Sequence, residues 1–531
     1  MKALLQLLAA ILSVVVCAGT NAQSATTKSD TPDTEWLGYN GGYDATRFSP
    51  LTQINTENIA RLKEVARFKI PETLSFQSGP VVVGDTMFVT TRENTYAIDA
   101  RTGVQRWLRY HELKHPESPG RLGRGVAYAD GRVFRGLVDG HVVAIDAKTG
   151  DMIWDVIGAD VDAGEFYTAA PIVWEGRVYL GNAGSDYGGI GHIRAFDAKT
   201  GKRLWSFDTV PSIGDAAKTW PDDAKRVKAG GGTYSSYALD TEGGLLYSPV
   251  GNPGPDFVRD YRRGDNLYTS SVIVLDARTG ELKGYHQLVK NDFHDWDVAA
   301  SPILFTSKAG RKMVAVAGKN GYLYGLSRDL KDVFFQTPLT RIENVEAPLT
   351  PEGTRFLPGT QGGTNWYGPC YSPVLNALFV PVIDWATTLK IADPKTLKHD
   401  PPKPFIGSAN GFGTQDPKEQ RFGHITAVDA DTGKVLWKYD TDTSMVASVT
   451  PTAGGVLLTG DTKGNFLAFE AANGHVLLKK DLHDPIGGGI VTYMLGGKQY
   501  VAVAGGMKNP IVQTESGPAW VAIFALPDHT D

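Results

Sequence analysis

The segment AIDARTGVQRW, residues 97–107, decides the fold, because its pattern returns five times along the chain. Every copy has an apolar strand, a tight turn of the D-A-x-T-G kind or a close variant, and a second strand that in most copies reaches a Trp. In the turn, Gly103 and its counterparts supply the positive φ that a hairpin connection requires. The other copies are AIDAKTGDMIW at 144–154, AFDAKTGKRLW at 195–205, VLDARTGELKG at 274–284, AVDADTGKVLW at 427–437 and AFEAANGHVLL at 468–478.

The spacing of the copies indicates a β-propeller. Neighbouring copies are about 40 to 50 residues apart where they are closest, which is the period of propeller blades. The segment 324–335 resembles a degenerate copy, and the segment 376–384 supplies a further strand without the turn, so that counting both gives about eight repeats. We therefore predict an all-β fold, an eight-bladed β-propeller of four-stranded antiparallel blades, because radial closure leaves only short strand edges exposed. The longer intervals, between Asp197 and Asp276 and before Asp429, predict insertions on one face, whereas the repeated Asp, Gly and Trp residues are turn and packing residues.

Composition excludes several classes of protein. The chain has 531 residues, 42% hydrophobic and 21% charged, which is typical of a globular protein with a large core. The formal net charge is −5 and no block of Lys or Arg is present, so nucleic acid is not an expected partner.

The N-terminus resembles a secretory signal. Lys2 is followed by an apolar run at 4–16 and by small and polar residues up to Ala22, which predicts a cleaved signal peptide at 1–22 and a single propeller domain at 23–531. No other apolar stretch approaches 18 residues, so we expect a periplasmic or secreted protein without stable membrane insertion. The alternative is a lipid-modified Cys17, although bulky Val16 precedes it. Cleavage leaves Cys370 as a lone thiol, which we expect in the core.

Three short motifs outside the repeats carry chemistry. They are GSDYG at 184–188, GNP at 251–253 and HDWDVA at 294–299. Each contains a carboxylate or an amide beside glycines or an aromatic residue: Asp186, Asn252 and Asp297. Hard oxygen ligands of this kind are what Ca²⁺ binds, and a carboxylate next to such an ion can act as a general base. The three residues are therefore a candidate calcium site with a base.

Beyond these motifs, the chain resembles pyrroloquinoline quinone (PQQ)-dependent alcohol dehydrogenases of the methanol dehydrogenase type, without a haem domain. The resemblance covers nearly the whole chain after the signal and follows the order of motifs in the family. The segments that carry it are EWLGYNGGYDATRFSPLTQINTENIARL from Glu35, GNAGSDYGGIGHIRAFDAKTG, GGGTYSSYALD, VGNPGP, GDNLYTSSVIVLDARTG, HDWD, GKNGYLYGL and TNWYGPCYSP.

The resemblance implies a role for each matched residue. Asp297 matches the catalytic base, and the metal ligands are Asp186, Asn252 and Asp297. Lys319 matches the basic residue at the quinone oxygens. The remaining cofactor contacts implied are Gln77, Arg124, Thr168, Ala183, Gly184, Ser185, Tyr234, Asn365 and Trp366. PQQ is an anionic tricarboxylate, so cationic Arg and Lys side chains suit it.

The chain also departs from the family pattern. The segment PGRLGRG at 119–125 lacks the vicinal disulfide found there in many members. Tyr234 stands where the family has a ring-stacking Trp, and Gln77 stands where many members have Glu. Asp186 replaces a Glu and is shorter by one methylene. We therefore expect weaker PQQ binding than in relatives that have the disulfide.

Two further absences bear on metal and electrons. Lanthanide-dependent members of the family carry an Asp two positions after the catalytic one, where this chain has Ala299, so Ca²⁺ is the expected ion. No C-x-x-C-H motif is present, so this chain binds no c-type haem and is expected to pass electrons to a separate acceptor such as a c-type cytochrome.

We therefore expect a PQQ- and calcium-dependent dehydrogenase that oxidises an alcohol, polyol, sugar or other hydroxyl substrate to the carbonyl compound. The alternative from another class is a non-catalytic propeller that binds proteins, similar to the lipoprotein of the outer-membrane assembly machinery. Such a scaffold has the repeats but no need of Asp186, Asn252 and Asp297 together. The substrate is not identified by the sequence; Tyr187, Phe293 and His294 are candidates to face it or to pack in the core.

Overall fold

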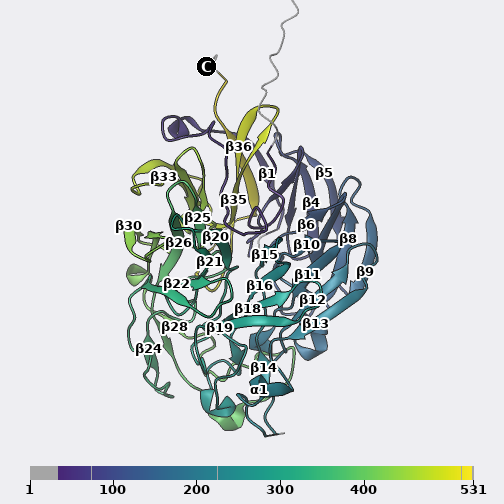
Figure 1. The fold of residues 1–531 in the computed structure, drawn as a ribbon, viewed down its shortest axis with the longest axis vertical. Coiled ribbons are helices and arrows are strands. Elements are labelled where there is room, and N and C mark those ends of the chain that lie inside the picture. Colours follow the sequence, from purple (N-terminus) through teal and green to yellow (C-terminus); the bar gives the residue numbers. More distant parts are fainter. Residues whose placement is uncertain (1–33, 73–74, 224, 516, 529–531) are drawn as a thin grey trace, which may run out of the picture.

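The computed structural model describes residues 34–72, 75–223, 225–515 and 517–528. The expected signal peptide at 1–22, with Cys17, lies outside these residues. The described residues form a β-propeller of four-stranded antiparallel sheets, with eight such sheets and two smaller ones (Figure 1).

Seven of the four-stranded sheets follow one another along the chain as simple meanders, and the eighth combines the last three strands with the first strand of the chain. Their strands are β2 (Val81–Val83), β3 (Thr86–Thr90), β4 (Asn94–Asp99) and β5 (Gln105–Tyr110); β6 (Ala127–Ala129), β7 (Arg132–Gly136), β8 (His141–Asp146) and β9 (Met152–Ile157); β10 (Ile172–Trp174), β11 (Arg177–Gly181), β12 (His192–Asp197) and β13 (Arg203–Asp208); β15 (Ala238–Asp240), β16 (Leu245–Pro249), β18 (Ser271–Asp276) and β19 (Leu282–Gln287); β20 (Ile303–Thr306), β21 (Lys312–Ala317), β22 (Tyr322–Ser327) and β23 (Val333–Pro338); β25 (Cys370–Ser372), β26 (Ala377–Asp384), β29 (Phe422–Asp429) and β30 (Val435–Thr441); β31 (Thr450–Pro451), β32 (Val456–Gly460), β33 (Asn465–Glu470) and β34 (Val476–Asp481); and β35 (Ile486–Leu495), β36 (Lys498–Gly505) and β37 (Trp520–Ala525) with β1 (Lys63–Lys69).

The ring is closed by pairing the two ends of the chain. β1 is antiparallel to β37, with Lys63 opposite Ala525 and Lys69 opposite Trp520. In Figure 1 the N-terminal β1 accordingly lies beside the C-terminal strands β35 and β36. Because this sheet contains strands from both ends, opening the ring would break backbone hydrogen bonds as well as apolar contacts.

Burial differs between the strands of a sheet in a regular way. In the sheet of β2–β5, the central strands β3 and β4 are buried along almost their whole length, while β5 alternates between exposed and half-buried residues. Apolar residues of neighbouring sheets form shared clusters between the sheets. A strand that is covered on both faces is expected to be a continuous run of apolar residues. The strands that end in AID or AFD in the repeats have this pattern.

The Trp of each repeat connects one sheet to the next. The indole N–H of Trp154 donates to the carbonyl of Ala198, in the D-A-x-T-G turn of the next sheet, at 3.1 Å. A Cβ added at Gly201 of that turn would lie 2.8 Å from the Trp154 ring, and the φ of Gly201 is +73°. The same indole bond recurs at three other repeats, those of Trp107, Trp205 and Trp437. The repeated Trp and Gly are therefore the packing residues that the sequence predicted.

The long intervals contain insertions, as the sequence predicted. They form a two-stranded sheet, a three-stranded sheet and short helices among the described residues. These elements are β14 (Ala229–Gly230) with β17 (Pro253–Gly254); β24 (Thr354–Phe356) with β27 (Thr387–Leu389) and β28 (Thr414–Gln415); α1 (Gly214–Ala217), η4 (Arg259–Arg262), η5 (Pro394–Thr396) and η6 (Lys418–Gln420). The short helices outside the insertions are η1 (Ile59–Arg61), η2 (Val161–Ala163) and η3 (Ser185–Tyr187).

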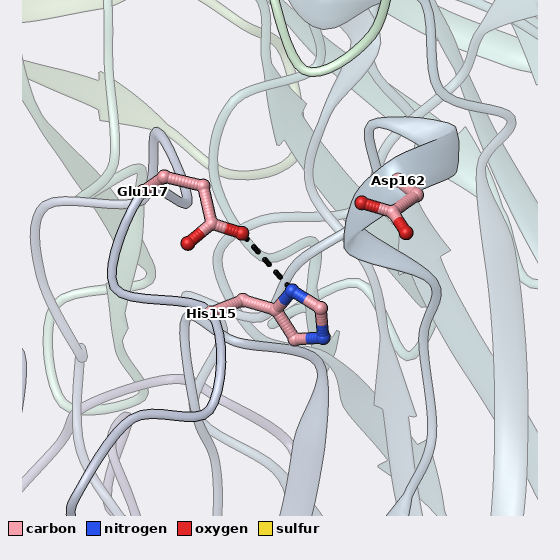
Figure 2. A group of neighbouring side chains, drawn as sticks. All are labelled: His115, Glu117 and Asp162. Atoms are coloured by element: carbon pink, nitrogen blue, oxygen red, sulfur yellow. Dashed lines mark hydrogen bonds and ion pairs between the residues drawn. The ribbon is translucent and has the colours of Figure 1, made fainter.

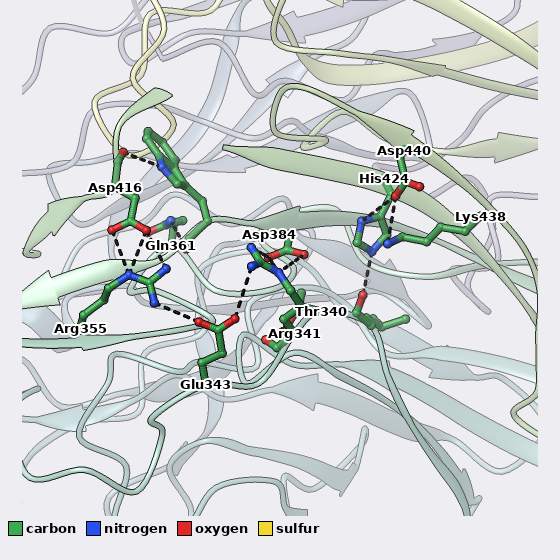
Figure 3. Close-up of polar contacts among 12 residues, drawn as sticks. Thr340, Arg341, Glu343, Arg355, Gln361, Asp384, Asp416, His424, Lys438 and Asp440 are labelled. Carbon is green, nitrogen blue, oxygen red and sulfur yellow. Dashed lines mark hydrogen bonds and ion pairs between the residues drawn. The ribbon is translucent and has the colours of Figure 1, made fainter. Parts of the chain in front are cut away.

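A chain of ion pairs ties the three-stranded insertion together (Figure 3). Arg355 of β24 binds Asp416, next to β28, at 2.7 Å and Glu343 at 2.9 Å. Arg341 then joins Glu343 to Asp384, the last residue of β26, at 3.3 and 3.0 Å. The network therefore connects the insertion to the end of β26, an inner strand of a propeller sheet.

Two remaining expectations concern Cys370 and the membrane. Cys370 is fully buried, and burial raises the pKa of its thiol to about 12, in agreement with the expected lone core thiol. Within the described part of the chain, we find no helix long and apolar enough to cross a bilayer.

The contact between neighbouring sheets can be tested by two substitutions. We expect Trp154→Ala to lower the free energy of unfolding by about 3 to 5 kcal/mol, because it removes a large buried ring and leaves a cavity. Trp154→Phe should cost clearly less, since it keeps an aromatic ring and loses chiefly the indole hydrogen bond, worth about 1 kcal/mol. Thermal and denaturant unfolding followed by circular dichroism measures both.

The matched control is Tyr110→Ala, which removes an aromatic ring from the fourth strand of another sheet, where the side chain is 58% exposed. It should change stability by no more than about 0.5 kcal/mol. A Trp154→Ala variant as stable as this control would contradict the structural role of the indole.

Candidate active site

A cavity of about 450 Å³ contains every residue that the sequence marked as a site residue. These residues are Gln77, Arg124, Thr168, Ala183, Gly184, Ser185, Asp186, Tyr234, Asn252, Asp297, Lys319, Asn365 and Trp366. A pocket of this volume is within the range that holds a cofactor or a small ligand. A smaller cavity, of about 280 Å³ beneath the N-terminal segment, contains none of them.

The residues of the wall come from two kinds of loop at one end of the sheets. The first kind of loop leads into the first strand of a sheet. Six successive sheets each contribute one site residue from this loop: Gln77, Arg124, Thr168, Tyr234, Asp297 and Trp366. The second kind of loop connects the second strand of a sheet to the third. Three sheets contribute site residues from this loop: 183–186, Asn252 and Lys319. In an antiparallel meander the start of the first strand and the end of the second lie at the same end of the sheet. The first strands of neighbouring sheets also contact one another, so these loops converge near the axis.

Three donors surround the carboxylate of Asp297, which is only 4% exposed. The backbone N–H of Asn252 donates to Oδ1 at 2.7 Å, and the hydroxyl of Tyr234 donates to Oδ2 at 2.9 Å. The ammonium of Lys319 lies 2.5 Å from Oδ2. Hydrogen bonds to an ionised carboxylate are strong, so these donors fix the orientation of Asp297.

Lys319 is the central cation of the cavity. Its Nζ also lies 3.2 Å from Oδ2 of Asp295. Burial alone would lower the pKa of Lys319, but the neighbouring Asp295 and Asp297 raise that pKa well above its usual value. The ammonium is therefore charged, and it is available to an anionic ligand next to Asp297.

Two carboxylates that the sequence analysis did not single out join the site. One carboxylate oxygen each from Asp186, Asp256 and Asp295 lies within 4.8 Å of the other two. Burial, followed by the charge of Asp297, raises the pKa of Asp186 to about 6. Burial also raises the pKa values of Asp256 and Asp295 well above their usual range, with the charge of Asp186 adding to the effect at Asp256. The cavity therefore carries an excess of buried acid groups.

Several polar atoms in the wall have no hydrogen-bond partner among the residues that the structure describes. They are Oδ1 of Asn252, Nε of Arg124 and Oε1 of Gln77, all buried. An unpaired buried polar group costs about 1 to 3 kcal/mol unless a ligand or water satisfies it. The carbonyl oxygen of Asn252 is a suitable ligand for a metal ion, and the guanidinium of Arg124 is a suitable partner for the carboxylates of PQQ. The residues present therefore fit both groups.

Tyr234 has a contact that its motif did not indicate. Its hydroxyl points to Asp297, and the guanidinium of Arg124 lies 5.1 Å from the centre of its ring. Arg124 in turn donates to Thr168 Oγ1 at 2.9 Å and to the carbonyl of Tyr234. Tyr234 is therefore more than a ring that substitutes for Trp, since it also positions the candidate base.

The flat and small residues of the wall are held firmly. Trp366 is 1% exposed, and its indole N–H donates to the carbonyl of Gly487 at 2.9 Å. Asn365 donates to the carbonyl of Gln361 at 2.9 Å. Gly184 has a φ of +122°, and a Cβ there would collide with the carbonyl of Gly164. The loop at Gly184 therefore admits only glycine, which leaves its backbone open to a flat ligand.

The insertions supply part of the cavity that the motifs did not identify. Phe412, Gly413 and Gln415, around β28, contribute to its wall. Of the three candidates for substrate contact, Tyr187 lines the cavity and packs edge-on against Phe166. Phe293 and His294 instead pack in the core, where the His294 ring stacks on Trp296 with the ring centres 4.0 Å apart.

A second group of possible metal ligands lies away from these residues. His115, Glu117 and Asp162 lie near one another, and His115 Nδ1 is 3.0 Å from Glu117 (Figure 2). The side chains of His115 and Glu117 are 41% and 57% exposed. Such an exposed pair is a common surface contact, and we assign it no function.

Comparison with known proteins identifies the family. A family model described as "PQQ: Glucose/ethanol/alcohol dehydrogenase, beta-propeller domain" matches residues 36–335, and one described as "Outer membrane protein assembly factor BamB" matches residues 421–518. The chain is 32% identical to the quinohemoprotein alcohol dehydrogenase of Comamonas testosteroni, over 90% of this chain and 73% of that protein. It is 28% identical to the lanthanide-dependent methanol dehydrogenase of Methylacidiphilum fumariolicum, over 89% of this chain and 85% of that protein.

A solved structure agrees with these matches. The structure of a europium-containing methanol dehydrogenase aligns with a TM-score of 0.84 at 25% identity, covering 93% of this chain and 98% of that one. The fold and the cavity thus define a propeller oxidoreductase of the quinoprotein class. The chain belongs to the family of PQQ-dependent alcohol dehydrogenases, as its resemblance implied.

Proposed function

We propose that the cavity binds PQQ next to a Ca²⁺ ion, and that the chain oxidises an alcohol, polyol, sugar or other hydroxyl compound to the carbonyl compound. The observation that carries the proposal is the carboxylate of Asp297, buried in the cavity wall and held by Asn252, Tyr234 and Lys319. In this proposal the eight four-stranded sheets are the eight blades of one domain, residues 23–531, of an exported protein.

The proposed cofactor contacts divide into three groups. Arg124 and Lys319 supply positive charge for an anionic tricarboxylate. Gln77, Thr168 and Asn365 supply hydrogen bonds. Tyr234 and Trp366 supply flat rings, while Ala183, Gly184 and Ser185 allow the close approach of a planar ligand. The unpaired Nε of Arg124 and Oε1 of Gln77 support these assignments.

For the metal ion we propose Asp186, Asn252 and Asp297 as ligands. Two carboxylates and an amide carbonyl are hard oxygen donors, and Ca²⁺ accepts them in irregular arrangements. The unpaired Oδ1 of Asn252 supports the assignment. Ca²⁺ is the proposed ion because residue 299 is Ala, where lanthanide-dependent members of the family have Asp.

The proposed chemistry assigns proton transfer to the protein. PQQ, when bound next to a metal ion, supplies an electrophilic carbon that accepts hydride from the substrate. Asp297 Oδ takes the proton of the substrate hydroxyl as general base. Tyr234 and the N–H of Asn252 hold the carboxylate in place, and burial of the site limits access of water. Because no haem motif is present, the electrons are proposed to leave to a separate acceptor, a c-type cytochrome.

The alternative, a protein-binding scaffold, has weaker support. The match to the assembly factor covers 421–518, a segment that contains none of the proposed site residues. Those residues lie between Gln77 and Trp366, and most of them fall within the span that matches the dehydrogenase model. The scaffold match therefore covers propeller repeats and lies outside the proposed cofactor and metal residues.

The role of Asp297 is tested by Asp297→Asn, which keeps the volume of the side chain. We expect turnover with an artificial electron acceptor to fall by about 10² to 10⁴-fold, because an amide does not accept the proton. PQQ binding, measured by calorimetry, should persist. The residue would be removed from the mechanism if the variant kept near wild-type turnover while fully loaded with PQQ.

The choice of ion is tested by reconstitution. We expect Ca²⁺ to restore activity to metal-free protein in the presence of PQQ far better than Mg²⁺, because Mg²⁺ demands a small octahedral shell and sheds water reluctantly. Turnover against a panel of alcohols at matched free metal concentrations measures this. Equal activation by both ions would contradict the proposed ligand set, and activity with lanthanides only would contradict Ca²⁺.

Tyr234 is tested by two variants that separate its ring from its hydroxyl. Tyr234→Phe should leave the PQQ dissociation constant within about threefold but lower turnover by about tenfold or more, because one hydrogen bond to a charged group is lost. Tyr234→Trp should tighten PQQ binding by a larger stacking surface, worth about 0.5 to 1.5 kcal/mol, yet also lose the bond to Asp297. PQQ titration and turnover measure the two effects independently. A Tyr234→Phe variant with unchanged turnover would contradict the positioning role.

A further inference from the structure

Asp256 is a buried carboxylate that the proposed function does not use. It is 0% exposed, and neither of its side-chain oxygens has a hydrogen-bond partner among the described residues. It lies two residues after β17, in the insertion between β16 and β18. An ionised carboxylate without a partner is among the most costly groups to bury, so its position calls for a cation.

Arg262 is close enough for its charge to lower the pKa of Asp256, but it makes no hydrogen bond to that carboxylate. Arg262 of η4 donates to the backbone carbonyls of Pro255 and Asp256 at 2.9 and 2.7 Å. Its remaining donors bind the carbonyl of Asp292 and the side chain of Asn266. Arg262 therefore holds the shape of the loop, and it leaves the carboxylate of Asp256 unpaired.

The carboxylate of Asp256 lies close enough to the candidate metal site to share its ion. One oxygen each of Asp186, Asp256 and Asp295 lies within 4.8 Å of the others. Two oxygens bound to one Ca²⁺ ion are at most about 5 Å apart, since each lies about 2.3 to 2.6 Å from the ion. A single cation can thus reach all three carboxylates.

The charge balance and a neutral group both indicate a cation at this point. The carboxylates of Asp186, Asp256, Asp295 and Asp297 lie together with few cations near them. Among the described residues, Lys319 forms ion pairs with Asp295 and Asp297, and the charge of Arg262 acts on Asp256 without a hydrogen bond to its carboxylate. Independently of the acids, the amide oxygen of Asn252 is buried at 0% exposure, unpaired, and in the wall of the same cavity. A neutral carbonyl oxygen next to carboxylates is a ligand pattern for a hard metal ion.

We infer that Asp256 is a ligand of the metal ion in this cavity and shifts the preference of the site toward cations of higher charge. The inference rests on the proposed function, because it concerns the same metal site. Lanthanide-dependent members of the family have an additional Asp at the position of residue 299, which is Ala in this chain. Asp256 would supply an additional carboxylate from a different loop, where the spacing from Asp297 does not reveal it. Because Asp186 is shorter than Glu by one methylene, its carboxylate reaches less far from its own loop, and a further ligand from another loop would complete the metal site.

The expected selectivity follows from Coulomb's law. Removing one unit of negative charge weakens the attraction to a trivalent ion about one and a half times as much as the attraction to a divalent ion at the same distance. Loss of a directly bound carboxylate that costs about tenfold in Ca²⁺ affinity should therefore cost about thirtyfold in La³⁺ affinity. A larger loss of affinity for La³⁺ than for Ca²⁺ therefore indicates that the removed side chain contributed a negative charge as a metal ligand.

The experiment titrates Ca²⁺ and La³⁺ by calorimetry into full-length, PQQ-free protein. Asp256→Asn removes the charge and keeps the volume. Asp260→Asn is the matched control, because it makes the same change four residues later on the exposed side of the same insertion. Asp186→Asn reports on the proposed metal site itself. We expect Asp256→Asn to lose about tenfold for Ca²⁺ and about thirtyfold for La³⁺, Asp186→Asn to lose affinity for both, and Asp260→Asn to bind as wild type.

Thermal unfolding of the same proteins provides a second readout. Without metal, Asp256→Asn should unfold at a higher temperature than wild type, because a buried carboxylate without a partner is removed. The increase in unfolding temperature on addition of La³⁺ should be smaller for Asp256→Asn than for wild type at the same La³⁺ concentration. If Asp256→Asn does not fold, Asp256→Glu keeps the charge and should retain La³⁺ affinity within about threefold.

The outcomes separate the inference from the function on which it rests. Wild-type binding of both ions by Asp256→Asn, with binding lost in Asp186→Asn, would refute Asp256 as a ligand and leave the metal site intact. Unchanged binding in Asp186→Asn as well would refute the proposed metal site. Equal losses for Ca²⁺ and La³⁺ in Asp256→Asn would refute its effect on charge preference.

Discussion

The contact between a tryptophan ring and the glycine turn of the next sheet is the interaction on which the ring of sheets depends. It has two parts, the indole hydrogen bond of Trp154 to Ala198 and the packing of the ring on Gly201, where no side chain fits. The indole bond recurs at Trp107, Trp205 and Trp437, so the same contact fixes how neighbouring sheets meet at four places in the ring. The loops that precede the first strands are thereby brought to one axis, and the cavity is a consequence of that convergence.

At the axis the dominant constraint is charge. Four carboxylates and one lysine lie where water has little access, and the carboxylate oxygens of Asp256 have no hydrogen-bond partner in the described part of the chain. Burying such groups without a counter-ion would cost more than the surrounding packing readily offsets. The fold tolerates them because its sheets are held by contacts elsewhere, in the apolar layers between blades and in the pairing of β1 with β37. Stability and chemistry are thus located in different parts of the molecule.

The fold could be predicted from the sequence because its determinants are local. The turn needs Gly201 in a left-handed conformation, and the Trp stands at a fixed distance along the same repeat, so both are visible in one short pattern. Even the degenerate copy at 324–335 keeps the contact, since Phe335 packs on Gly433 of the next turn in place of a Trp. The covering insertions have no repeat, and their shape could not be predicted.

The site was predictable to the extent that its residues stand in motifs. Asp186, Asn252 and Asp297 each have a distinctive local setting, whereas Asp256 looks like an ordinary loop residue and becomes part of the site only by its burial. Asp295 carried a signal that could have been used. Asp295 stands two residues before Asp297 in the same HDWD motif, and this closeness along the chain could have marked it as a neighbour of the candidate base. The hydroxyl of Tyr234 shows the limit of the method, because a residue type does not state which atom its side chain will contact.

The insertion at β24, β27 and β28 contributes to the cavity from outside the repeated sheets. Its residues Phe412 and Gln415 close the cavity opposite the blade loops, and ion pairs from Arg355 and Arg341 fasten it to the propeller. Exposed ion pairs contribute little each, yet a connected series resists the separation of its members more than isolated pairs do. Changes in this insertion can therefore alter the mouth of the cavity without disturbing Asp297 or Lys319, which are held by the blades. A family that keeps one redox chemistry and varies its substrates requires this separation of the two parts of the site.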